Sequence, residues 1–83
     1  MFKVLVDSRI GKKVMLMEPE HKKDFLEIVE LFQHHGQIGL PLSRLGNVWR
    51  VPTQNIRVIY KIEEKKVILL DVLLGFDKDN YVG

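Results

Sequence analysis

The chain has 83 residues, 46% of them hydrophobic and 29% charged, and this length leaves room for one domain. The lack of cysteine excludes disulfides, thiolate zinc sites and cysteine nucleophiles, and the lack of a long apolar run excludes a membrane span, so we expect a cytoplasmic protein. The formal net charge of +2 disfavours binding through many phosphates, but it allows a site with a few positioned cations.

The first half of the chain predicts one strand and two helices. Residues 2–6 are rich in β-forming side chains, and either Asp7 or Ser8 can cap a helix that runs to about Met17. A second helix is expected from Pro19, which suits a first helical turn, to the C-terminal turn His34–Gly36. Apolar residues at helical spacing predict one buried face on each helix. These residues are Ile10, Val14 and Met17 in the first helix, and Phe25, Ile28, Val29 and Phe32 in the second.

The second half predicts three strands, at residues 48–51, 55–62 and 66–74, after a loop that contains Gly39 and Pro41. The order β-α-α-β-β-β indicates a single α+β domain over residues 1–83, with the helical pair packed on one face of a small, mainly antiparallel sheet. Trp49 is expected to anchor the core.

The last two strands form a hairpin whose register should follow from the apolar pattern. One face of the first strand is formed by Ile56, Val58, Tyr60 and Ile62. A loop with an odd number of residues around Glu63–Lys65 adds residues 68, 70, 72 and 74 of the second strand to that face, whereas an even loop brings Asp71 into it. We therefore expect the odd loop, with Arg57 opposite Asp71 on the open face of the sheet. Arg50 points to the same open face if its neighbours in the strand face the core.

The three histidines raise the question of a metal site. His34 and His35 are adjacent, so they project to different sides of a helix, and no carboxylate or third histidine stands at a usable spacing. Protonated histidine is favourable at a helix C-terminus without any metal. We expect no metal site and no cofactor.

The strands of the second half carry motifs of a known family. Trp49-Arg50-Val51 is followed by Asn55-Ile56-Arg57-Val58-Ile59-Tyr60, by an aliphatic strand from Val67 to Leu74, and by Gly75. This series resembles the RelE/ParE toxin superfamily, whose members carry a strand like YRI, then YRVIYEI, an aliphatic strand and a tail such as GHRKDVY. The order of elements also matches, so the resemblance extends over essentially the whole chain, with its specific part at residues 45–81.

The resemblance implies a toxin of a type II toxin–antitoxin system, neutralised by an acidic, DNA-binding antitoxin. RelE-like members cut mRNA in the ribosomal A site, and ParE-like members poison DNA gyrase. RelE-like cleavage uses no metal, because the 2′-hydroxyl of the substrate attacks the adjacent phosphate. The protein supplies positive charge, usually the largest catalytic term, and proton transfer. The implied function is therefore a ribosome-dependent endoribonuclease, that is, an mRNA interferase.

Four residues receive roles from the resemblance, and Lys61 is added by its position on the sheet. Arg57 matches the arginine of the YR motif, and Lys78 and Tyr81 match the family tail, which implies catalytic roles for these three. Arg50 stands at a basic position of the preceding strand, and Lys61 shares the face of Arg57, which makes both candidates for substrate binding. Arginine suits phosphate because its donors form a fixed fork.

The tail also departs from the family pattern. Phe76 and Asp77 stand where GHRKDVY has histidine and arginine, which replaces a phosphate-binding cation with an anion. The series Gly75-Phe76-Asp77-Lys78 also resembles the ending of HigB-like toxins, in which Lys78 is the retained cation, and both branches stay open.

Two alternatives to the catalytic interpretation stay open at this stage. A toxin-fold protein without ribonuclease activity, acting on gyrase or binding another partner, is favoured by the acidic residues Asp71 and Asp77 on or near the cationic face. Arg57 is either a phosphate ligand or one half of a surface ion pair with Asp71.

Overall fold

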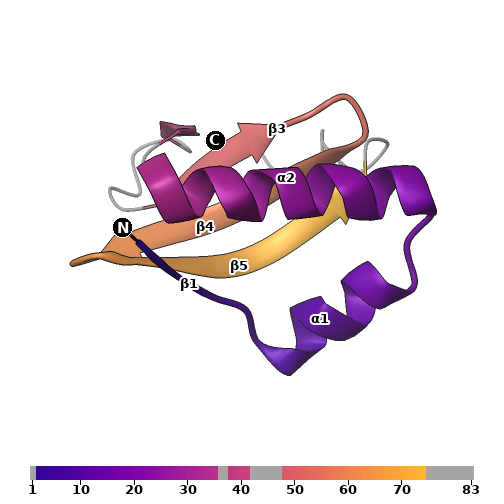
Figure 1. Ribbon diagram of the computed structural model, residues 1–83, viewed down its shortest axis with the longest axis horizontal. Coiled ribbons are helices and arrows are strands. Elements are labelled where there is room, and N and C mark those ends of the chain that lie inside the picture. Colours follow the sequence, from indigo (N-terminus) through magenta and orange to yellow (C-terminus); the bar gives the residue numbers. More distant parts are fainter. Residues whose placement is uncertain (1, 36–37, 42–47, 75–83) are drawn as a thin grey trace.

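The computed structural model describes residues 2–35, 38–41 and 48–74, which form two helices and a five-stranded mixed sheet (Figure 1). The elements are β1 (Lys3–Leu5), α1 (Ser8–Met15), α2 (Pro19–His35), β2 (Leu40–Pro41), β3 (Val48–Pro52), β4 (Ile56–Glu63) and β5 (Lys66–Leu74). The strand order across the sheet is β1-β5-β4-β3-β2, with β1 parallel to β5 and the other pairs antiparallel. The predicted α+β class is confirmed, whereas the short strand β2 was not predicted. Neither described helix is long and apolar enough to cross a membrane.

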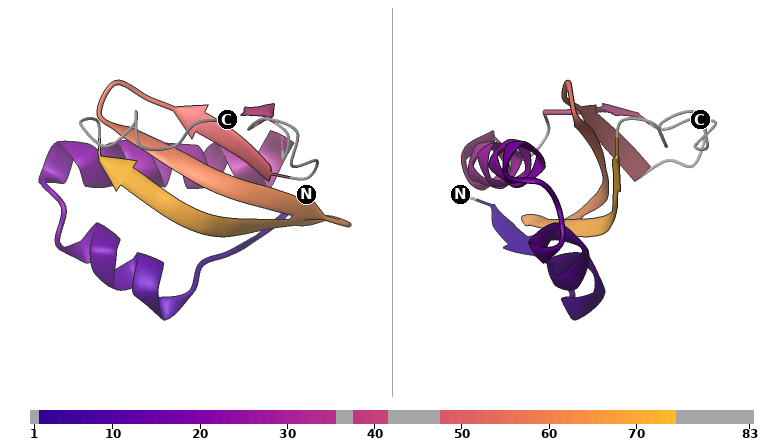
Figure 2. Two further views of the ribbon diagram at one scale, coloured as in Figure 1. Left: turned by 180° about the vertical axis from the view of Figure 1, so that it is seen from behind. Right: turned by 90° about the vertical axis from the view of Figure 1, so that its right-hand side faces the viewer.

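Helix α1 begins as its sequence predicts. Asp7 is the N-cap, and its Oδ1 accepts a hydrogen bond from the backbone N–H of Ile10 at 2.9 Å. Ile10 is fully buried, Met17 is 9% exposed, and Val14 packs against the same core, so the predicted apolar face is confirmed. α1 lies beside the outer edge of β5, beyond the point where β1 ends (Figures 1 and 2).

Helix α2 covers one face of the sheet (Figure 2). Its predicted apolar stripe is confirmed, with Phe25, Ile28 and Phe32 buried in one core cluster with residues of β4 and β5. The rings of Phe32 and Tyr60 are tilted by 57° with their centroids 4.5 Å apart, a favourable aromatic arrangement. The opposing sheet residues are all fully buried: Ile56, Val58, Tyr60, Val67 and Val72. α1, α2 and the sheet therefore share one core.

Tyr60 also holds the segment that leads into β2. Its hydroxyl oxygen accepts a hydrogen bond from the backbone N–H of Gly39 at 2.9 Å. A side chain at Gly39 would collide with the carbonyl oxygen of Arg50 and the hydroxyl of Tyr60, so only glycine fits there. Burial raises the pKa of the Tyr60 hydroxyl, and the hydrogen bonds with the backbone of residues 38 and 39 partly oppose this rise.

The β3–β4 loop is fastened to α2 by one carboxylate. Oδ2 of Asp24 lies 2.9 Å from the hydroxyl of Thr53 and accepts a hydrogen bond from the side-chain amide of Asn55 at 3.1 Å. The Thr53 hydroxyl also accepts the backbone N–H of Ile56 at 3.0 Å. These contacts set the position at which β4 begins.

The prediction of an odd number of residues in the β4–β5 loop is wrong. The two strands are joined by a two-residue turn, Glu64 and Lys65, after the pair Glu63–Lys66, and Glu64 has a positive φ of 58°. Near this turn Tyr60 pairs with Leu69, so residues 67 and 69 face the core in place of the expected 68 and 70.

A β-bulge restores the expected alternation further along the hairpin. The register shifts between Ile59 and Tyr60, so that Leu70 and Asp71 both fall between the core-facing residues Leu69 and Val72. Beyond the bulge, Val58 pairs with Val72, and residues 72 and 74 face the core as predicted. The bulge thus keeps Asp71 out of the core although the loop is even.

Candidate functional site

The face of the sheet opposite α2, here called the distal face, carries the candidate site. Alternation along β3 and β4 directs Val48 and Arg50, and Arg57, Ile59 and Lys61, to this face. Ile59 and Leu73 are buried at 2% and 7% exposure and form a second apolar cluster, against which Val48 and Leu70 pack. The distal face therefore combines an apolar centre with cations from two neighbouring strands.

The cations are arranged around Ile59 by the strand register. Arg50 pairs directly with Ile59, and Arg57 and Lys61 stand two residues to either side of Ile59 on β4. Each of them is thus a diagonal neighbour of Arg50, at a Cα separation of about 7–8 Å. Both arginines are partly exposed, but their Nε atoms are buried, which holds the guanidinium groups close to the sheet. Three of the five sequence-predicted site residues therefore share one face.

Lys61 has an acidic neighbour on its own strand. Its Nζ lies 3.1 Å from Oε2 of Glu63, and both side chains are about one third to one half exposed to solvent. A pair of this kind contributes at most about 1 kcal/mol, since water screens it and ordering two long side chains costs entropy. Glu63 therefore holds the ammonium group of Lys61 only weakly.

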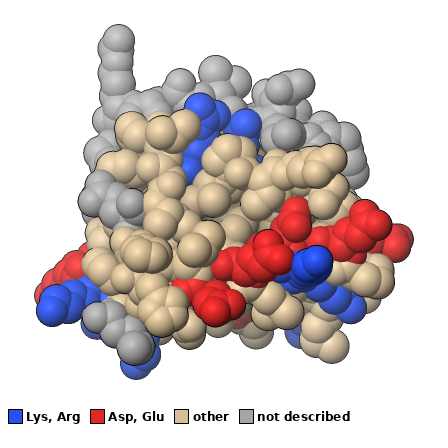
Figure 3. Space-filling model, turned by 45° about the horizontal axis from the view of Figure 1, so that its top comes forward, with Lys and Arg blue, Asp and Glu red and all other residues tan. Residues whose placement is uncertain are grey.

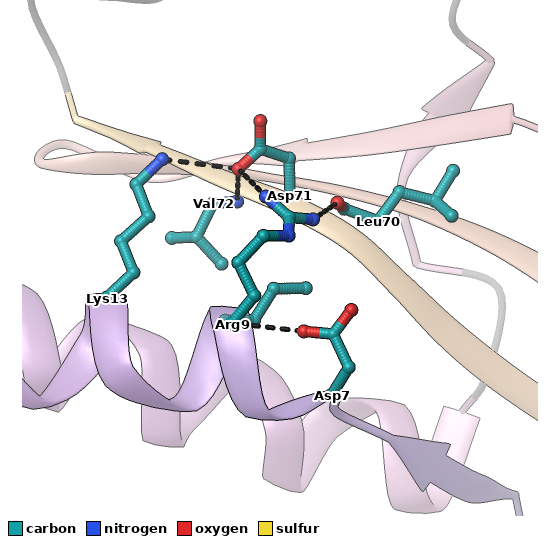
Figure 4. Close-up of polar contacts among 7 residues, drawn as sticks. Asp7, Arg9, Lys13, Leu70, Asp71 and Val72 are labelled. Atoms are coloured by element: carbon teal, nitrogen blue, oxygen red, sulfur yellow. Dashed lines mark hydrogen bonds and ion pairs between the residues drawn. The ribbon is translucent and has the colours of Figure 1, made fainter.

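Asp71 does not lie opposite Arg57, contrary to the prediction. In the observed register Asp71 pairs with Ile59 and Arg57 pairs with Leu73, because the two-residue turn and the bulge each shift the pairing by one residue. Oδ1 of Asp71 instead accepts a hydrogen bond from Nζ of Lys13 at 3.2 Å and lies 3.9 Å from Nη1 of Arg9, both in α1 (Figure 4). The same oxygen accepts the backbone N–H of Val72 at 2.8 Å. Asp71 fastens α1 to β5.

The cluster around Asp71 also explains how the outer edge of β5 is completed. β1 pairs with β5 only as far as Ile68, so the edge beyond it needs other hydrogen-bond partners. Nη2 of Arg9 donates a hydrogen bond to the carbonyl oxygen of Leu70 at 2.7 Å (Figure 4). Oδ1 of Asp71 accepts a hydrogen bond from the backbone N–H of Val72. The sequence interpretation missed this cluster. Its one local signal was the i, i+4 spacing of Arg9 and Lys13 in a helix without acidic residues.

The remaining predicted site residues are not part of the described structure. Lys78 and Tyr81, together with Phe76 and Asp77 of the divergent tail, lie outside the described residues. Their predicted roles in catalysis stay predictions.

The histidines lie where the sequence placed them. His34 and His35 are exposed in the last turn of α2, with ring centroids 6.4 Å apart, and His21 is partly exposed in the first turn. Within residues 2–35, 38–41 and 48–74, no three histidine, aspartate or glutamate side chains are grouped as ligands for a metal ion.

No protein-family model matches the chain, and no curated protein matches it.

Proposed function

We propose that the protein is a toxin of a type II toxin–antitoxin system that cleaves mRNA on the ribosome and binds the RNA backbone on its distal face. The observation that supports this proposal is the grouping of Arg50, Arg57 and Lys61 around Ile59 on two adjacent strands. The same two strands carry the motifs that resemble the RelE/ParE superfamily.

The spacing of the three cations suits an extended single strand of RNA. Arg57 and Lys61 are four residues apart on β4, which corresponds to about 13 Å, and Arg50 lies between them on β3. A backbone that follows β4 would meet the three cations in succession. With only a few cations, the protein needs the ribosome to present the substrate, since such a surface gives weak affinity for free RNA.

The proposed reaction is an attack of the 2′-hydroxyl oxygen on its own 3′-phosphorus. The bond from phosphorus to the 5′ oxygen of the next nucleotide breaks, which leaves a 2′,3′-cyclic phosphate and a 5′-hydroxyl. The guanidinium groups of Arg50 and Arg57 stabilise the negative charge that develops on the phosphorane oxygens. On the basis of the sequence resemblance, proton transfer at the cleaved nucleotide is assigned to Tyr81, and Lys78 is assigned as a further cation at the phosphate.

Mapping mRNA ends after induced expression tests this proposal. Wild-type protein should arrest growth and create new mRNA ends at preferred positions within codons, with 2′,3′-cyclic phosphates on the upstream fragments. Arg57→Gln should lower cleavage about 100- to 1000-fold, the usual effect of removing one preorganised donor. Lys23→Gln is the matched control, because it removes one exposed cation from α2 and should cleave normally. Growth arrest without new ends would reject the nuclease.

The alternative is a toxin-fold protein that acts only by binding. The observation that favours it is Asp77, which stands in the sequence where the RelE-like tail has a cation. Asp71, the other acidic residue that favoured it, contacts Lys13 and Arg9 of α1. Growth arrest together with loss of DNA supercoiling by gyrase, and with intact mRNA, would favour this alternative.

A further inference from the structure

The turn between β3 and β4 closes directly beside Arg57. The backbone N–H of Thr53 donates a hydrogen bond to the carbonyl oxygen of Ile56 at 2.7 Å, and the Thr53 hydroxyl oxygen accepts one from the N–H of Ile56 at 3.0 Å. The next pair, Pro52 with Arg57, is the last pair of the ladder between the two strands. Because proline has no N–H, Pro52 cannot donate a hydrogen bond to Arg57. The position of this end of β4 therefore depends on the turn.

Arg57 is the cation of the distal face that lies nearest to this turn. Arg50 and Lys61 belong to pairs of the β3–β4 ladder that are further from the turn. On the other side of β4, the ladder with β5 ends only one pair beyond Arg57. Hydrogen bonds at the end of a ladder open more readily than those in its interior. The position of Arg57 is thus more sensitive to the turn than that of Arg50 or Lys61.

A carboxylate of α2 holds the turn from the helix-facing side of the sheet. Oδ2 of Asp24 accepts hydrogen bonds from the Thr53 hydroxyl at 2.9 Å and from the side-chain amide of Asn55 at 3.1 Å. Hydrogen bonds to an ionised acceptor are stronger than those between neutral groups. Asp24 is partly buried, and its neighbour Phe25 is buried in the core, so the carboxylate extends from a part of α2 that the core holds in place. Asp24 therefore connects the core to the turn beside Arg57.

Asp24 differs from the other acidic residues of α2. Glu20, Glu27 and Glu30 are exposed on this helix, and acidic side chains form a band on the face shown in Figure 3. By its charge alone, each of these carboxylates repels RNA, so removing one of them should strengthen the attraction of RNA. A loss of activity on removal of Asp24 would therefore have the opposite sign to the effect of its charge.

We infer that Asp24 is a positioning residue of the proposed active site: through Thr53 and Asn55 it holds the start of β4, so that the guanidinium group of Arg57 meets the phosphate in the transition state. The inference rests on the proposed ribonuclease function. Asp24 acts through Arg57 and not on the substrate, because it belongs to the helix that covers the other face of the sheet. A displacement of about 1 Å in an active site can cost about 100-fold in rate, so a loosened turn should slow cleavage.

Cleavage of mRNA by the purified full-length protein on programmed ribosomes tests the inference. Asp24→Ala should lower kcat about tenfold and change KM by less than about twofold. Asp24→Asn keeps an oxygen that accepts hydrogen bonds from the turn, and should cleave within about threefold of the wild-type rate. Glu27→Ala is the matched control, because it removes one exposed carboxylate of α2 and should cleave at least as fast as wild type. A wild-type kcat for Asp24→Ala, or an equal loss for Glu27→Ala, would overturn the inference.

A double variant separates positioning from a general loss of structure. If Asp24 acts through Arg57, adding Asp24→Ala to the Arg57→Gln protein should lower the rate by less than about twofold, because the positioned group is already absent. The same loss in the wild-type and Arg57→Gln backgrounds would overturn the inference. Thermal melts set the assay temperature, so that every variant is folded when its rate is measured.

NMR relaxation of the arginine Nε–H groups keeps this test separate from the test of the proposed function. The Nε atoms of Arg50 and Arg57 are buried, which protects their N–H groups from exchange with water. Asp24→Ala should lower the order parameter of Arg57 and leave that of Arg50 unchanged. If the wild-type protein cleaves no mRNA, the proposed function fails, but this result would still support the positioning of Arg57 by Asp24. Unchanged relaxation of Arg57 would overturn the inference whether or not the protein cleaves mRNA.

Discussion

The two faces of the sheet differ sharply although they are built from the same strands. On β4, Ile56, Val58 and Tyr60 face α2 and are fully buried, whereas Arg57 and Lys61 alternate with them and face the other way. Burial of the first set stabilises the fold, and the charges of the second set contribute little to it. Stability and the proposed activity are therefore carried by alternate residues of one strand, and substitutions should separate them.

The largest expected effect is on the helix-facing side. Phe32→Ala removes a fully buried ring that packs against Tyr60, and should lower the free energy of unfolding by about 3–5 kcal/mol. Urea denaturation followed by circular dichroism measures this loss. A loss below about 1 kcal/mol would mean that α2 does not cover the core as described.

A smaller loss is expected at the edge of β5. Asp71→Ala leaves the N–H of Val72 without its acceptor and removes the anchor of Arg9 and Lys13, which should cost about 1–3 kcal/mol. Hydrogen exchange should accelerate first in α1. Faster exchange confined to β4, with α1 unchanged, would instead assign Asp71 to the distal face.

Helix α1 offers a change of the opposite sign. Gly11 lies inside the helix, and a Cβ at this position would meet no atom within 4 Å. Gly11→Ala should therefore raise the free energy of unfolding by about 0.5–1 kcal/mol, through the lower backbone entropy of alanine in the unfolded chain. A lower melting temperature for this variant would indicate a steric contact that the described structure lacks.

The smallest effect is a pH dependence on the helix-facing side. Because the folded state raises the pKa of Tyr60 above its unfolded value of about 10, the contribution of Tyr60 to stability is complete below pH 10. It decreases as the pH rises above 10 towards the folded pKa. Wild-type stability should therefore fall more steeply above pH 10 than that of Tyr60→Phe, which cannot ionise. Parallel curves for the two proteins between pH 9 and 11 would contradict the burial of this hydroxyl.

Most of the fold could be predicted from the sequence, because helical and strand periodicity are local signals. The apolar faces of both helices and the alternation of β4 follow directly from the order of residues. The number of residues in the β4–β5 loop could not be predicted. A two-residue loop followed by a bulge at Leu70 keeps Asp71 out of the core as effectively as a loop with an odd number of residues. β2 was missed because it is only two residues long and follows Gly39, whose hydrogen bond to Tyr60 joins positions 21 residues apart.

The candidate site could also be predicted in part from the sequence. Arg50, Arg57 and Lys61 share a face because two adjacent strands alternate in phase, and the sequence pattern shows that alternation. The partners of Asp71 were not predictable, since Lys13 lies 58 residues away and nothing local joins β5 to α1. Lys78 and Tyr81 lie outside the described residues, so the roles expected of them stay predictions.

The most direct test of the central claim compares neighbouring residues of β4 in one preparation of ribosomes programmed with a defined mRNA. Cleavage rate and free energy of unfolding are measured for Arg57→Gln and Val58→Ala. We predict that Arg57→Gln loses about 100-fold or more in rate and changes stability by less than about 1 kcal/mol. Val58→Ala should lose about 1–3 kcal/mol of stability and, at temperatures where it is folded, cleave at the wild-type rate. Full cleavage by a folded Arg57→Gln protein would contradict the assignment of the distal face to RNA.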